Sequence, residues 1–163
     1  MERIATLFEA MVAYDSPSKS RIAHFAKVHN YARQIGLLEG VDEVTQLTLE
    51  AAAIVHDIGI KVCLETYGSQ AGHLQETEGP PLAEAMLTSI GFDKRTIERV
   101  SFLVGHHHTY DTIEGIDYQI LVESDFLVNL EEKAASKETI RGTYDQIFKT
   151  ATGKRICSLL FGL

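Results

Sequence analysis

The residues of this chain best suited to chemistry are an adjacent imidazole and carboxylate, His56 and Asp57, at the end of the apolar run 51–55. The run predicts a buried helix, and Gly59 ends it where the core meets a cleft. Burying either polar group without a partner costs several kcal/mol. A metal ion would satisfy both groups at once, so this pair indicates a metal site.

Two further polar residues interrupt apolar helical patterns. His24 shares a helical stripe with Val28 and Tyr31, and a lone histidine there is commonly a satisfied core residue. Asp125 shares a face with Leu121 and must bind a helix cap, an arginine or a metal. His24, His56, Asp57 and Asp125 are far apart in sequence, but a helical fold can bring them together.

The elements expected to position these residues are almost all helices. Few helix breakers and many helix-forming residues favour this class, and no alternating strand pattern occurs. Residues 59–80 are rich in glycine and lead into Pro80-Pro81, which predicts a loop region, with room for one short helix, that shapes the substrate mouth. The expected helices span residues 4–13, 20–35 (stopped by Gly36), 42–57 (with Asp42 as N-cap), 81–90, 93–106, 117–133 and 136–149, followed by a short C-terminal helix through 156–160.

Length and charge narrow the class of protein. The 163 residues suit one domain, and the net charge of −8 argues against binding to nucleic acid or anionic membranes. No stretch reaches the roughly 20 apolar residues of a membrane span, and the N-terminus lacks a signal peptide, so we expect a soluble cytoplasmic protein. The two cysteines, Cys63 and Cys157, are expected to be free thiols.

The order His24, His56-Asp57, Asp125 in a helical chain resembles the HD-domain superfamily of metal-dependent phosphohydrolases. The similarity covers about residues 20–130 and rests on three segments, 24–28 (HFAKV), 53–59 (AIVHDIG) and 122–127 (VESDFL). It implies an all-α, single-domain HD-type helical bundle over residues 1–163. It also implies that these four residues bind one divalent metal ion, which could be Mn, Mg, Co, Ni, Zn or Fe.

A second histidine cluster, His106-His107-His108, follows the apolar helix 93–106. Such a run can be a solvated helix end, but His107 continues the apolar stripe. By the same resemblance, His106 and His107 would bind a second metal. Two-metal members carry an additional histidine before this cluster at the start of a helix, whereas the intervening His73 is expected in the glycine-rich loop. Glu76 and Glu78 lie near that place, and we assign Glu78 as the substitute ligand.

The resemblance implies metal-assisted hydrolysis of a phosphate ester, with a nucleotide or another small phosphorylated metabolite as substrate. Asp57 would accept the proton of the attacking water, and Lys61 would bind phosphate oxygens unless it is an ordinary solvated lysine. Two alternatives stay open, namely a di-iron O₂-dependent oxidoreductase of the same fold and a non-catalytic nucleotide-sensing module. A homodimer is also compatible with the sequence.

Overall fold

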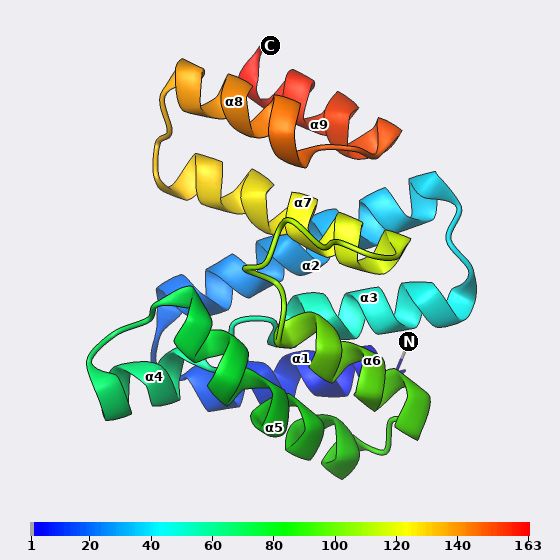
Figure 1. Cartoon of the computed structure of the whole chain (residues 1–163). Helices are drawn as coiled ribbons and strands as arrows, with labels where there is room; N and C mark the ends of the chain where they lie inside the picture. The colour runs from blue at the N-terminus through cyan, green and yellow to red at the C-terminus, as the bar shows by residue number, and fades with distance from the viewer. Residues whose placement is uncertain (1) are drawn as a thin grey trace.

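The computed structural model describes residues 2–163, and over this range the chain forms α-helices and no strand (Figure 1). The all-α class predicted from the sequence is therefore confirmed. In chain order the helices are α1 (Glu2–Asp15), α2 (Lys19–Glu39), α3 (Glu43–Val55), α4 (Ile60–Tyr67), α5 (Gly72–Ile90), α6 (Lys94–Val104), α7 (Ile116–Glu132), α8 (Lys137–Ile147) and α9 (Ala151–Phe161).

Helix α3 is the centre of the molecule. It packs against α1, α2, α6 and α7, and its residues 51–55 are fully buried. A helical segment that is apolar all round, as 51–55 is, needs neighbours on every side, and its three small alanines allow those neighbours to approach closely. His56 and Asp57 follow directly after this helix, so the fold delivers them to the middle of the bundle.

The ends of several helices follow the capping rules used in the prediction. The carboxylate of Asp42 accepts hydrogen bonds from the backbone N–H groups of Val44 and Thr45 at 3.0 and 3.1 Å, as an N-cap does. Asp93 caps α6 in the same way. Helix α2, however, does not stop at Gly36 and continues to Glu39.

The reason is that Gly36 serves packing and not termination. A Cβ atom at this position would lie 2.2 Å from Oε1 of Gln46 and 3.1 Å from Cδ2 of Leu49 on α3, so a larger residue would displace these side chains. The residue that ends α2 is Gly40, whose φ of 71° lies in the left-handed region.

The predicted loop over 59–80 is also largely wrong, because α4 and the first part of α5 occupy it. Pro80 and Pro81 lie inside α5, although a proline there loses a backbone hydrogen bond. Packing against α6 keeps the helix continuous, with Pro80 close to Gly105. Gly59 likewise allows contact, since a Cβ there would lie 3.1 Å from the backbone nitrogen of Gly79.

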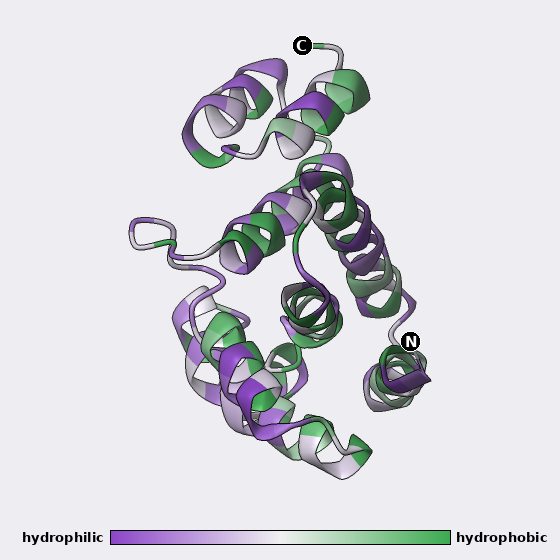
Figure 2. Cartoon of the chain, turned by 90° about the vertical axis from the view of Figure 1, so that its right-hand side faces the viewer, coloured by the Kyte–Doolittle hydropathy of each residue, from purple (hydrophilic) through white to green (hydrophobic). Residues whose placement is uncertain are grey.

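Helices α8 and α9 lie together at one end of the molecule, next to α7 (Figure 1). The fully buried carboxylate of Glu123 on α7 holds this end by accepting hydrogen bonds from the backbone N–H groups of Lys149 and Thr150 at 2.6 and 2.9 Å. Most helices carry both hydrophobic and hydrophilic residues, as expected for amphipathic elements (Figure 2). Over the described range, no helix is long and apolar enough to cross a membrane.

Candidate metal centre

His24 on α2, His56 and Asp57 after α3, and Asp125 on α7 converge in the structure. Nε2 of His24 lies 3.3 Å from Nε2 of His56, and 3.1 and 3.4 Å from carboxylate oxygens of Asp125 and Asp57. Nε2 of His56 lies 3.4 Å from Oδ2 of Asp57 and 3.5 Å from Oδ1 of Asp125. The structure thus brings together the four residues that the sequence analysis selected.

The hydrogen bonds of the imidazole rings fix which nitrogen faces the centre. Nδ1 of His56 donates to the carbonyl of Ala53 at 2.9 Å, and Nδ1 of His24 donates to Glu132 at 2.9 Å. In the neutral ring the proton then sits on Nδ1, and the lone pair of Nε2 points at the two carboxylates. Two lone pairs facing two anions repel one another unless a positive charge lies among them.

The spacing of these atoms fits a divalent cation. Ligands about 2.1 Å from a metal ion lie roughly 3.0 to 3.4 Å from one another in octahedral or tetrahedral arrangements. The separations of 3.1 to 3.5 Å lie within this range or 0.1 Å above it. His24, His56 and Asp57 also offer atoms within 4.8 Å of one another as one candidate metal-binding group.

The titration behaviour of the metal-free chain reflects the same need for positive charge. Burial disfavours the charged ring of His56, but the charges of Asp57 and Asp125 and the hydrogen bonds to both carboxylates together outweigh burial and hold the pKa of His56 well above its usual value. Burial opposes ionisation of Asp57 too, yet the charge of His56 and hydrogen bonds from the surrounding rings hold the pKa of Asp57 well below its usual range. Both shifts arise because imidazole rings and carboxylates lie close together in this buried centre.

A second group shares Asp57 with the first and adds His107 and His108 from the turn after α6. Nε2 of His107 lies 3.4 Å from Oδ1 of Asp57, while its Nδ1 donates to the carbonyl of Val104 at 2.8 Å. The Nε2 atoms of His107 and His108 are both buried and have no hydrogen-bond partner within residues 2–163. Burial and the neighbouring His107 lower the pKa of His108 to about 4, which keeps its ring neutral. These residues form a second candidate metal-binding group, and Asp57 is common to both groups.

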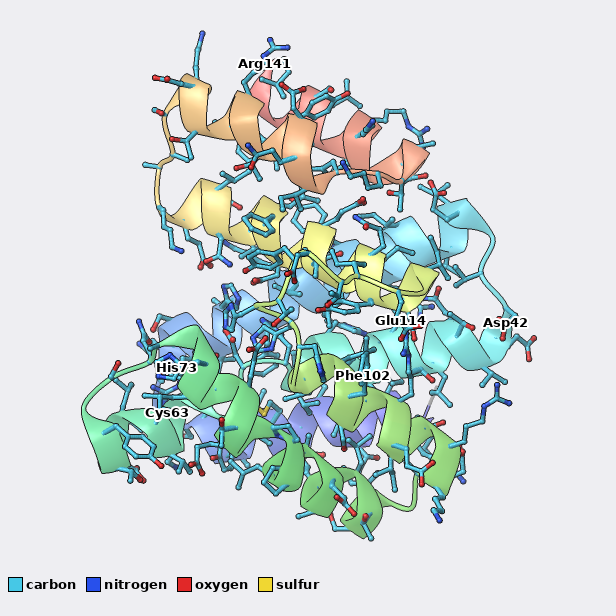
Figure 3. The ribbon with its side chains drawn as sticks, viewed as in Figure 1. Asp42, Cys63, His73, Phe102, Glu114 and Arg141 are labelled. Carbon is cyan, nitrogen blue, oxygen red and sulfur yellow. The ribbon has the colours of Figure 1, made fainter. Side chains whose placement is uncertain are left out.

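Three residues predicted for the site are placed elsewhere. Nδ1 of His106 donates to the carbonyl of Phe102, and the His106 ring stacks on the Phe102 ring (Phe102 is labelled in Figure 3). Helix α6 ends at Val104, and the turn that follows directs His107 and His108 inward instead of His106. Glu78 accepts a hydrogen bond from the hydroxyl of Tyr67.

The third, Lys61, lies on α4 and donates to the carbonyl of Tyr14 at 3.0 Å. Its ammonium also lies 5.0 Å from the centre of the Tyr14 ring. Although Lys61 is four residues after Asp57 in the chain, α4 directs it toward the end of α1, so the structure does not bring it to the carboxylates.

Sequence reasoning missed several residues that the structure places around the centre. Asn129 donates to Oδ1 of Asp125 at 2.8 Å, and Glu132 orients His24 as described above. They lie four and seven residues after Asp125, on the same face of α7, so helical spacing could have identified them. Such supporting groups fix the orientation of metal ligands.

A cavity of about 280 Å³ opens directly on this centre. Its lining includes Asp57, Asp125 and His108 together with Gln75, Tyr110 and Lys133. A larger cavity of about 850 Å³ lies among α1, α2 and α3, around the ion pair of Arg33 and Glu50, and none of the converging residues line it. The smaller cavity is the candidate substrate site because Asp57, Asp125 and His108 line it.

A comparison with solved structures agrees with this architecture. The chain is similar to the 1.45 Å crystal structure of a predicted HD superfamily hydrolase from an uncultured Thermotogales bacterium, with 24% sequence identity and a TM-score of 0.66. The alignment covers 99% of this chain and 84% of that one. No protein-family model matches the chain, and a comparison with curated proteins gives no significant match. The structural likeness shows that the chain has the HD-type helical fold.

Proposed function

We propose that this protein is a metal-dependent hydrolase that cleaves the phosphate ester of a nucleotide or another small phosphorylated metabolite. The observation that carries the proposal is the position of Asp57, whose two oxygens face two different imidazole groups while the residue itself lines the cavity. A carboxylate shared by two cations beside a small cavity suits phosphoryl chemistry. The similar structure, a predicted hydrolase, supports the same class of reaction.

His24, His56, Asp57 and Asp125 would hold one divalent cation, and Asp57, His107 and His108 a second. When bound, such ions lower the pKa of coordinated water and neutralise charge on phosphoryl oxygens. The metal-lined floor of the cavity is therefore where the phosphate group of the substrate would lie.

The rest of the cavity supplies groups that suit an anionic substrate. Lys133 lines it and makes no ion pair with any residue in the described range, so its ammonium is free to bind a phosphate oxygen. Burial, followed by the charge of Asp125, raises the pKa of Tyr110 to about 12, which keeps its hydroxyl protonated as a hydrogen-bond donor. The volume of about 280 Å³ favours a small substrate.

The test is phosphate release by Mn²⁺-loaded protein from p-nitrophenyl phosphate and a series of nucleoside 5′-monophosphates. Asp57→Asn should lower kcat by about two orders of magnitude or more, because it removes the shared ligand and the proton acceptor. Asp145→Asn is the matched control, since Asp145 is exposed on the distant α8 and should leave kcat unchanged.

Other results would point to the alternatives. Saturable nucleotide binding without phosphate release would indicate a non-catalytic sensing module. Two bound irons with O₂ consumption would indicate an oxidoreductase. Equal activity of the Asp57→Asn variant and the wild type would contradict the proposed role of the metal centre.

A further inference from the structure

The side chain of Gln75 on α5 presents a buried oxygen whose hydrogen-bonding capacity is unused. The residue is only 5% exposed, and its Nε2 donates to the backbone carbonyl of Gln70 at 2.8 Å. This bond fixes the orientation of the amide group. Oε1 is then left buried, with no donor in the part of the chain that the structure describes. A buried amide oxygen without a partner is costly, so it indicates a ligand.

The packing of α5 places Gln75 between the two segments that supply the second metal group. The neighbouring Glu76 accepts a hydrogen bond from the backbone N–H of His108 at 3.0 Å. On the other side, a Cβ atom on Gly59 would lie 3.3 Å from Cα of Gln75, so the segment that follows Asp57 packs directly on this turn of α5. Gln75, Asp57 and His108 line the same cavity.

Four electron-pair donors belong to this region, because Gln75, Asp57 and His108 line one cavity and His107 faces Asp57. They are Oε1 of Gln75, Nε2 of His107, Nε2 of His108 and Oδ1 of Asp57. A water molecule has only two protons and could satisfy two of them, whereas a cation can accept electron pairs from all four. We infer that Oε1 of Gln75 is a ligand of the second divalent cation. This inference deepens the proposed function, because it rests on the same two-cation centre.

The type of atom that Gln75 offers has a consequence for metal selectivity. Amide and carboxylate oxygens suit Mn²⁺ and Mg²⁺, whereas imidazole nitrogens suit Zn²⁺, Ni²⁺ and Fe²⁺. With Gln75, the second position combines two imidazoles with two oxygen ligands. A histidine in place of Gln75 would raise the share of nitrogen and move the preference away from Mn²⁺.

The experiment is equilibrium dialysis of the metal-free full chain against Mn²⁺, with bound metal measured by elemental analysis. Wild type should bind two Mn²⁺ per chain. Gln75→Leu, which keeps the volume but lacks the oxygen, should bind the second Mn²⁺ at least tenfold more weakly. Gln70→Leu is the matched control, because it changes an exposed side chain of the same cavity but keeps the backbone carbonyl that Gln75 uses.

A second variant keeps the test decisive if Gln75→Leu fails to fold, which circular dichroism would reveal. Gln75→His should retain two sites and raise the affinity for Zn²⁺ relative to Mn²⁺ at least tenfold. Unchanged affinities and selectivity in the folded variants would overturn the inference.

Metal binding and hydrolysis are measured separately, so their failures can be told apart. Binding that depends on Gln75, without hydrolysis of any phosphate ester, would leave this inference standing and refute the proposed function. Hydrolysis of a phosphate ester, together with equal Mn²⁺ binding by wild type and Gln75→Leu, would support the proposed function and refute this inference.

Discussion

Removal of divalent metal should lower the melting temperature of this protein substantially, because the candidate centre gathers ionised carboxylates and imidazole lone pairs from separate helices. A cation present at 100 times its Kd stabilises the folded state by about 2.7 kcal/mol per site. For a chain of 163 residues, 1 kcal/mol corresponds to roughly 2–4 °C in melting temperature. Each occupied site should therefore raise the melting temperature by about 5–11 °C.

The assay is thermal unfolding followed by circular dichroism at 222 nm, since the fold is helical and the chain contains no tryptophan. Wild type is compared in EDTA and in excess Mn²⁺, beside Asp57→Asn and the control Asp145→Asn. Asp57→Asn should lose most of the rise because Asp57 belongs to both groups, whereas the control should keep it. Identical melting temperatures of wild type with and without metal would refute the reasoning.

Two further predictions concern charged groups that support the bundle. Glu132→Gln should weaken the binding of the first cation about 10-fold to 100-fold, because the negative partner of Nδ1 of His24 is lost; an Mn²⁺ titration with unchanged affinity would contradict this. The second concerns Glu50, where burial opposes ionisation but hydrogen bonds from His29 and from Gln46 and Arg33 lower the pKa from 4.5 to about 2. The ionised carboxylate of Glu50 therefore stabilises the fold fully above about pH 4.5, and this contribution is lost as the pH falls toward 2. The difference in melting temperature between wild type and Glu50→Gln should be constant near neutral pH and should narrow between about pH 4.5 and 2.

The parts of the fold that the sequence predicted well are those governed by local interactions. Asp42 and Asp93 begin helices because their carboxylates bind backbone N–H groups two or three residues later, a contact that local spacing determines. Gly36 and Gly40 could not be told apart in the same way. Gly36 allows close contact with α3, whereas Gly40 ends α2 with a positive φ. Only the tertiary structure decides which of the two glycines ends the helix.

The same distinction explains the site. The convergence of His24, His56, Asp57 and Asp125 could be anticipated because each interrupts or ends an apolar helical pattern and because their order resembles that of a known superfamily. The histidine run could not be resolved, since α6 ends at Val104 and helical periodicity says nothing about the turn that follows. Lys61 was selected for its nearness to Asp57 in the chain, whereas the lysine that reaches the cavity is Lys133, at the far end of α7.

The position of Asp57 also links the chemistry to the stability of the fold. The first group joins α2, α7 and the end of α3, and the second joins the end of α3 to the turn after α6. Both groups need the carboxylate at the C-terminal end of α3, the helix that packs against most of its neighbours. A cation in either group therefore cross-links segments that are distant in sequence, and such links are absent from the unfolded chain. If the proposed function holds, metal binding at this centre should therefore also stabilise the bundle, and loss of metal should reduce activity and melting temperature together.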